Sequence, residues 1–282
     1  MTLRDLGALA RAAIRAWSDD YAPSMGAALA YYALFSLSPL LLIALVVAGW
    51  LFPAEVENGV IAGQLISLAG PAGAQALQGL LEAAREPGRG VFAAGLGMVL
   101  LVIGATTVFG ELQSALDRIW RVPAPPGTSN LWRLVRSRLA AFAMIIATGA
   151  LLLGWLAGGT LLAARGAASG VPPLALHAVE IGLGMVIATV LFALIYKIVP
   201  RARIAWRDVG TGALVTAALF SLGKFAIAWY IGRTGVTSAF GAAGSLAALL
   251  VWLYYSAQIF LLGAEFTWVY AHRTGSRSAL PS

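Results

Sequence analysis

The stretch GAAGSLAALLVWLYYSAQIFLLGAEFTWVY, residues 241–270, decides the fold. Roughly 20 apolar residues, rising about 1.5 Å each in a helix, suffice to cross a bilayer. One residue departs from this apolar pattern, because Glu265 places a carboxylic acid at membrane depth. Such a charge costs about 3 kcal/mol even on lenient insertion scales, so it usually faces protein or water. The stretch therefore predicts a spanning helix with an inward-facing acid.

The composition of the whole chain is that of an integral membrane protein. Hydrophobic residues make up 60% and charged residues 11% of its 282 residues, whereas soluble domains average roughly 45–50% and 25%. The expected fold class is all-α, with six transmembrane helices at about 25–52, 91–110, 139–164, 174–199, 209–231 and 241–270. The connections are too short for a separate soluble domain of about 50 residues, so 1–282 is predicted to be a single membrane domain.

The segments outside the six spans have distinct patterns. Residues 2–20 place Leu6, Leu9, Ala13 and Trp17 on one stripe, which predicts an interfacial amphipathic helix rather than a signal peptide. Residues 53–90 are too polar to span and are predicted to form an outer helical loop. Residues 111–138 and 197–208 are predicted to be basic loops on the opposite side of the membrane.

The distribution of Lys and Arg predicts the orientation. Most of the 19 basic residues fall on the side of the two termini; the exceptions are Arg85, Arg89, Arg165 and Arg233 opposite and Lys224 within a span. This asymmetry predicts cytoplasmic termini. It also accounts for the net charge of +7 through topology and contact with anionic lipids, so nucleic acid is not an expected partner.

Few residues are available for metal or nucleophilic chemistry. The chain has no Cys, and its two His, His177 and His272, fall in different connecting regions. Thiolate metal sites and Cys nucleophiles are thereby excluded, and a His-based site is not expected. The sequence predicts no cofactor, no metal and no enzymatic activity.

A helix break is predicted inside the first span at Ser36, Ser38 and Pro39. Pro39 has no N–H to donate and crowds the preceding turn, while the serine hydroxyls can satisfy freed backbone groups. Broken helices at mid-membrane mark many transport sites, although Pro is also simply tolerated in membrane helices.

Polar residues within the spans form the candidate site. Tyr254, Gln258 and Glu265 share one stripe of the last span at about 100° per residue, and Glu111 is predicted at the depth of Glu265. Lys224 and Glu180 are predicted to share the outer half of the membrane. Two interpretations remain open: ion pairs that fix helix packing, or a polar cavity for a lipid headgroup or other anion, with proton coupling through Glu265 or Glu111 as a variant.

Deep phenols extend this candidate site. Tyr31, Tyr32, Tyr254 and Tyr255 are placed well inside the spans, where a hydroxyl needs a hydrogen-bond partner. They are therefore expected to line the interior, whether that interior is a cavity or a packed core.

Several separated blocks resemble one bacterial family. They are GAALAYYALFSLSPLLL (26–42), TTVFGELQSALDRIW (106–120), FALIYKIVPRARIAWRDVGTGAL (192–214) and GAAGSLAALLVWLYYSAQIFLLGAEF (241–266). Together they resemble the YihY / virulence factor BrkB family of inner-membrane proteins, over nearly the whole chain. Asp117 stands where such proteins often have Asn. The resemblance implies six spans with cytoplasmic ends and a bacterial inner-membrane location.

Two functions are compatible with these patterns. The first is a transporter or flippase-like protein for an envelope lipid or other amphiphile, and the second is a membrane scaffold that supports envelope integrity. A ribonuclease label attached to relatives receives little support, because acidic residues are few and scattered. Gly/Ala-rich faces allow a homo-oligomer but equally serve packing within one chain.

Overall fold

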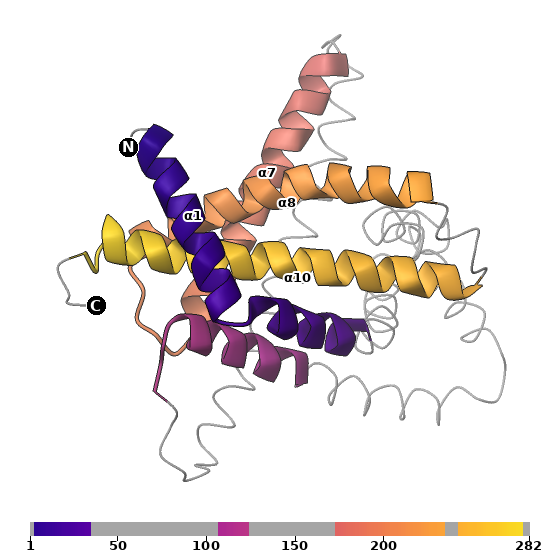
Figure 1. Ribbon diagram of the computed structural model, residues 1–282. Helices are drawn as coiled ribbons and strands as arrows, with labels where there is room; N and C mark the ends of the chain where they lie inside the picture. Colours follow the sequence, from indigo (N-terminus) through magenta and orange to yellow (C-terminus); the bar gives the residue numbers. More distant parts are fainter. Residues whose placement is uncertain (1–2, 35–106, 124–172, 235–241, 279–282) are drawn as a thin grey trace, which may run out of the picture. The chain divides into compact units, whose positions relative to one another are not determined.

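The computed structural model describes residues 3–34, 107–123, 173–234 and 242–278, and their regular structure is entirely helical (Figure 1). Four helices have defined bounds: α1 (Leu3–Asp19), α7 (Pro173–Ile198), α8 (Trp206–Thr234) and α10 (Ala242–Arg273). Residues 22–34 and 107–119 are also helical. The chain divides into two compact units. The first comprises Met1–Pro23, Leu112–Lys224 and Gln258–Ser282, and the second Ser24–Glu111 and Phe225–Ala257.

Helices occupy the segments predicted to be helical wherever the structure describes them. α10 covers the predicted last span, α7 the fourth, α8 the fifth, and α1 the predicted N-terminal amphipathic helix. The connection predicted at 111–138 is described only up to residue 123, and its first part is helical. Residues 107–119 form one helix whose apolar side chains Leu116 and Ile119 are fully buried. Burial of these residues stabilises this helix.

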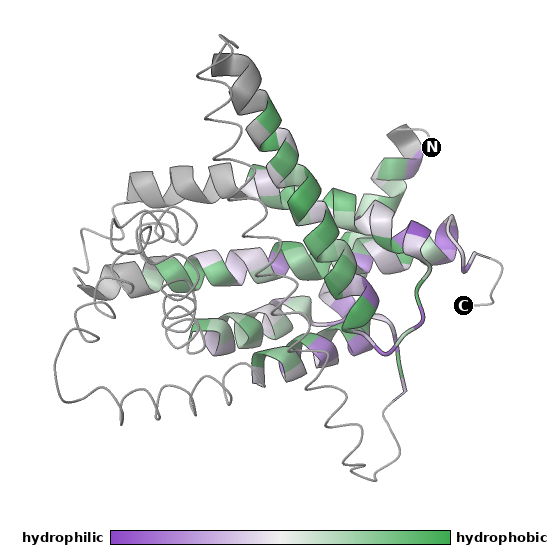
Figure 2. Ribbon diagram, turned by 180° about the vertical axis from the view of Figure 1, so that it is seen from behind, coloured by the Kyte–Doolittle hydropathy of each residue, from purple (hydrophilic) through white to green (hydrophobic). Residues whose placement is uncertain are grey.

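Two described segments are long and apolar enough to cross a bilayer. They are Ile181–Ile198 of α7, with mean hydropathy 2.2, and Leu249–Arg273 of α10, with mean hydropathy 1.4. Only 11% of the α7 segment is buried, and Val186 and Val190 are among its exposed side chains. Figure 2 shows the green, apolar character of α7 along its coloured length. Exposing such an apolar surface to water is unfavourable, whereas contact with lipid suits it.

α1 packs across the C-terminal part of α10. Leu9 and Ala13 of α1 form a buried cluster with Phe266 and Val269 of α10. Leu6, on the same stripe, and Ile14 beside it stay exposed, as the predicted interfacial helix requires. α1 ends at Asp19, and Tyr21 follows in the left-handed region at φ 57°. This conformation is a common way of ending a helix.

α8 and α10 meet through two reciprocal glycine–threonine contacts. A Cβ on Gly212 of α8 would lie 1.8 Å from the Oγ1 of Thr267, and a Cβ on Gly263 of α10 would lie 1.9 Å from the Oγ1 of Thr216. Each threonine hydroxyl donates to the carbonyl of the glycine four residues before it, at 2.8 Å for Thr216 and 2.7 Å for Thr267. Small residues thus allow close approach of the backbones, as in many membrane helix pairs.

Candidate functional site

Glu265 belongs to the first compact unit. Its side chain on α10 is fully buried, and no described residue donates a hydrogen bond to either carboxyl oxygen. The charged groups that interact with it are the carboxyls of Asp20 and Asp19, just after and at the end of α1, and the guanidinium of Arg121. Two carboxylates cannot hydrogen-bond to each other unless one carries a proton. The surroundings of Glu265 are therefore rich in charge but poor in donors.

Gln258, predicted to share the stripe of Glu265, contacts the chain just after α1. Its Nε2 donates to the carbonyl of Pro23 at 3.3 Å, while its buried Oε1 receives no hydrogen bond from the described residues. Tyr254, the third member of the predicted stripe, is exposed. Along the stripe, the side chain is thus exposed at Tyr254, half-buried at Gln258 and fully buried at Glu265.

A buried phenol joins three helices of the first unit. The Oη of Tyr196 on α7 donates to the carbonyl of Phe260 on α10 at 2.7 Å and lies 3.1 Å from the Oγ1 of Thr216 on α8. The ring of Tyr196 also packs against Phe260, with centroids 5.0 Å apart. This network fixes α7 to the glycine–threonine contact between α8 and α10.

We expect Tyr196→Phe to lower stability by about 1 kcal/mol, because the change removes hydrogen bonds but keeps the ring. Thermal unfolding in detergent, followed by circular dichroism, measures the effect. Tyr254→Phe is the matched control, since that tyrosine is exposed. An equal loss in both variants would contradict the assigned network.

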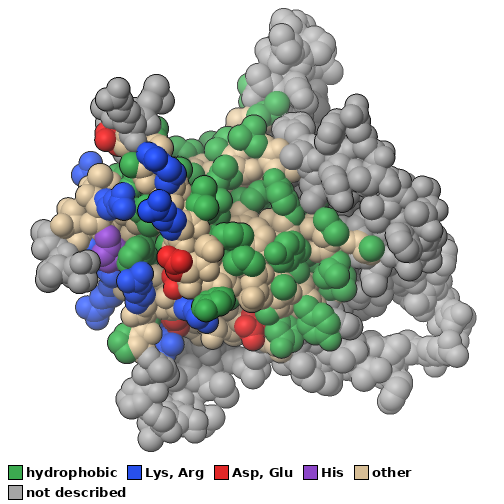
Figure 3. Space-filling view, in the orientation of Figure 1, with side chains coloured by type: hydrophobic (Ala, Val, Ile, Leu, Met, Phe, Trp, Pro, Cys, Tyr) green, Lys and Arg blue, Asp and Glu red, His purple; other side chains and the backbone are tan. Residues whose placement is uncertain are grey.

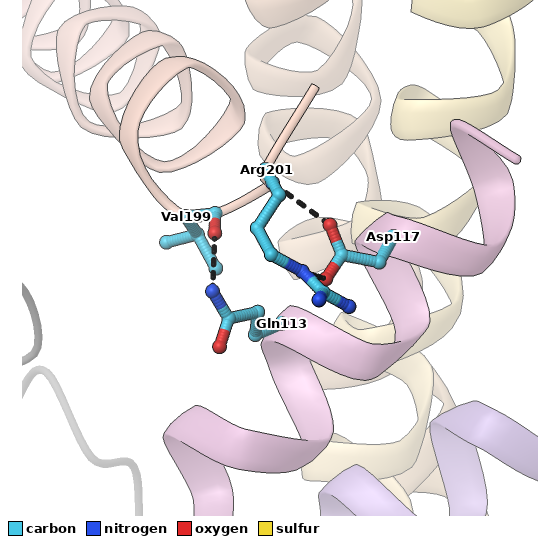
Figure 4. Close-up of polar contacts among 4 residues, drawn as sticks. All are labelled: Gln113, Asp117, Val199 and Arg201. Atoms are coloured by element: carbon cyan, nitrogen blue, oxygen red, sulfur yellow. Dashed lines mark hydrogen bonds and ion pairs between the residues drawn. The ribbon is translucent and has the colours of Figure 1, made fainter. Parts of the chain in front are cut away.

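Asp117 holds the α7–α8 connection on the helix at 107–119 (Figure 4). Its Oδ1 accepts the backbone N–H of Arg201 at 2.8 Å, and its Oδ2 accepts the Arg201 Nε at 2.6 Å. One helical turn earlier, Gln113 donates to the carbonyl of Val199 at 3.2 Å. Asp117 is buried, so its charge is matched by an arginine and a backbone donor.

Asp208 holds the chain after α10 against the start of α8, again by accepting hydrogen bonds. It is buried in the first turn of α8 and accepts the backbone N–H of Ser276 at 3.2 Å. Arg277 then donates to the carbonyl of Arg203 at 2.7 Å. These contacts join the basic connection between α7 and α8 to the basic chain after α10.

The other predicted site residues are placed as follows. Tyr31 and Tyr32 lie in the second unit with ring centroids 5.5 Å apart, and Tyr31 is exposed. Glu111 is half-buried in the second unit and Tyr255 is half-buried on α10. The predicted match of Glu111 with Glu265 stays a prediction. The side chains of Glu180 and Lys224, and the predicted break at Ser36, Ser38 and Pro39, lie outside the described residues.

No group of three or more His, Asp or Glu able to hold a metal ion occurs in the described parts of the chain.

The family follows from comparison with known proteins. The model of the virulence factor BrkB family matches residues 13–282. The chain belongs to the virulence factor BrkB family. No solved structure matches it.

Related BrkB-family chains come from several bacteria. A UPF0761 membrane protein of Ralstonia nicotianae is 27% identical over 268 residues, covering 92% of this chain and 58% of the relative. One from Halorhodospira halophila is 29% identical over 267 residues, covering 93% and 57%. The chain thus spans less than two thirds of the length of these relatives. Together with the apolar helices α7 and α10, these names identify a bacterial membrane protein of the BrkB type.

Proposed function

We propose that this BrkB-family protein transports an envelope lipid or related amphiphile across the membrane, acting as a transporter or flippase rather than as an enzyme. The observation that carries the proposal is the contrast between its buried acids. Asp117 and Asp208 are held by several donors each, as structural carboxylates usually are. Glu265 is equally buried on a helix able to span a membrane, yet no described residue donates to it.

An acid without donors is suited to a changing environment. A carboxyl with fixed hydrogen bonds stabilises one arrangement of helices, whereas Glu265 can exchange a proton or meet a polar group as the helices move. Its neighbour Asp20 can bond to it only when one of the two carboxyls is protonated. We therefore infer that Glu265 couples protonation or headgroup contact to rearrangement of α10 against α1.

The second candidate function is a membrane scaffold. The glycine–threonine contacts between α8 and α10, fixed by Tyr196, favour a rigid arrangement of these helices. A scaffold needs such rigidity and does not need a buried acid without donors. The two functions therefore differ in what they require of Glu265.

Glu265→Gln is expected to abolish most lipid translocation in proteoliposomes while leaving protein abundance and thermal unfolding near those of the parent. Glutamine keeps the shape of the side chain but cannot ionise, so it neither takes up nor releases a proton. Tyr254→Phe, on the exposed side of the same helix, is the control and should translocate lipid like the parent. Translocation unchanged by Glu265→Gln would contradict this role for Glu265, and the scaffold function predicts no translocation by the parent at all.

A further inference from the structure

A basic cavity lies where α1 meets the C-terminal end of α10. Its volume is about 530 Å³, within the range of about 300–1,000 Å³ typical of small-molecule sites. Four arginines line it, namely Arg11, Arg15, Arg121 and Arg273, together with His272 and the acidic Asp19 and Asp20. Figure 3 shows blue side chains gathered over α1 and this end of α10, with acidic side chains among them.

The sequence of α1 builds one wall of the cavity. Ala8, Ala12 and Ala16 recur every four residues and leave space, while Arg11 and Arg15 stand beside them on the same half of the helix. At about 100° per residue, this face lies roughly opposite the exposed apolar residues Leu6 and Ile14. If the apolar face rests in the membrane interface, the cavity faces the headgroup and aqueous side.

α10 and the chain after residue 119 build the other wall. The guanidinium of Arg121 lies over the ring of Trp268, 4.4 Å from its centroid. The rings of Trp268 and His272 are also in contact, with centroids 4.5 Å apart. The His272 Nδ1 donates to the carbonyl of Trp268 at 2.8 Å, which leaves its Nε2 available. Arg121 itself adopts φ 51°, in the left-handed region, just after the helix at 107–119 ends.

The arginines of the cavity retain donors for a ligand. Arg11 uses its Nε to donate to the carbonyl of Gly7 at 3.2 Å, and the rest of its guanidinium stays available. The cavity arginines take no part in the ion pair between Arg201 and Asp117. Neutralisation of the α10 C-terminus could account for Arg273 but not for Arg11 and Arg15 within α1.

We propose that this cavity binds a phosphate group, either that of a phospholipid headgroup or that of a soluble phosphate. Several guanidinium groups around one space suit the planar, bidentate recognition of phosphate oxygens. The four arginines outnumber Asp19 and Asp20, so the cavity attracts anions. The proposal goes beyond lipid transport, because a scaffold could hold the same group.

The test uses the whole protein and two probes. Calorimetry with inorganic phosphate, on protein in nanodiscs of phosphatidylcholine, measures binding of the soluble form. Native mass spectrometry after exchange against mixed phosphatidylcholine and phosphatidylglycerol counts retained anionic lipid. Saturable binding of phosphate assigns the site to a soluble phosphate, and selective retention of phosphatidylglycerol assigns it to a headgroup.

The double variant Arg15→Gln with Arg273→Gln is expected to weaken binding of the successful probe at least tenfold. The matched control is Arg203→Gln with Arg207→Gln, which removes the same charge from exposed arginines outside the cavity and should change affinity less than twofold. Asp19→Asn, which removes a negative charge from the cavity wall, should strengthen binding severalfold.

The proposal is overturned if neither probe binds the parent, or if the cavity and control double variants lose affinity equally. The outcome is independent of the transport assay. A parent that binds phosphate without translocating lipid contradicts transport alone, and one that translocates lipid without binding either probe contradicts the phosphate site alone.

Discussion

Gly263→Ala is expected to destabilise the protein by about 1–3 kcal/mol, as overpacking of a close contact usually does. The added methyl would lie 1.9 Å from the Oγ1 of Thr216 and 2.7 Å from the Oη of Tyr196. Neither partner can turn away without losing a hydrogen bond, because Thr216 donates to Gly212 and Tyr196 to Phe260. Thermal unfolding in detergent should therefore occur several degrees lower.

Gly210→Ala is the control for this prediction. No atom lies within 4 Å of the Cβ that it would add to α8, so the change should be neutral or stabilising by up to about 1 kcal/mol. Thr216→Ala combined with Gly263→Ala should recover part of the lost stability by removing the nearest hydroxyl. If both glycine variants unfold at the temperature of the parent, α8 and α10 do not approach as closely as described.

Asp117→Ala is expected to lower the free energy of unfolding by about 1.5–3 kcal/mol, the usual contribution of hydrogen bonds to a charged group. The change leaves the Arg201 backbone N–H and guanidinium without their acceptor, so the connection between α7 and α8 should separate from the helix at 107–119. Limited proteolysis at Arg201 and Arg203 reports that separation directly, and thermal unfolding gives the stability. Faster cleavage at these two arginines is the expected result.

Asp117→Asn separates the two contributions of this carboxyl. The amide oxygen can still accept the backbone N–H of Arg201, and only the ion pair is lost. Because the Arg201 side chain is 41% exposed, that pair contributes little, and we expect a loss below about 1 kcal/mol. Equal effects of Ala and Asn would mean that the ion pair, not the backbone contact, holds the connection.

The sequence predicts the helices of this protein well for a physical reason. A run such as 241–270 is apolar on nearly every face, and in a bilayer such a run has few alternatives to a helix. The observed α10, Ala242–Arg273, extends it by one turn or less at its end. The second span is predicted to end at 110, before the polar Glu111, and the helix itself continues to residue 119.

The contacts between helices were predicted much less well. The ion pair of Asp117 with Arg201 joins residues 84 apart, and the contact of Asp208 with Ser276 joins residues 68 apart. Periodicity carries no information about such partners. Glycine followed four residues later by threonine occurs at 212–216 and 263–267, but this spacing alone does not reveal that the two helices approach closely there.

The candidate site was likewise predicted only in part. The unusual position of Glu265 was evident because any acid in an apolar run is conspicuous. Its neighbours Asp20 and Arg121 were not evident, since both lie just beyond helix ends and attract no attention in the sequence. The basic cavity was equally hidden, because α1 contributes alternate alanines and arginines that read only as the polar face of an amphipathic helix.

Lipid translocation by the purified parent protein tests the central proposal most directly. Proteoliposomes with fluorescent phosphatidylglycerol in the inner leaflet, treated with an external quencher, report how quickly lipid crosses the bilayer. A transporter or flippase predicts translocation well above that of protein-free liposomes and of liposomes with Glu265→Gln. A parent protein that is correctly folded, with or without an imposed proton gradient, yet moves lipid no faster than protein-free liposomes would contradict it.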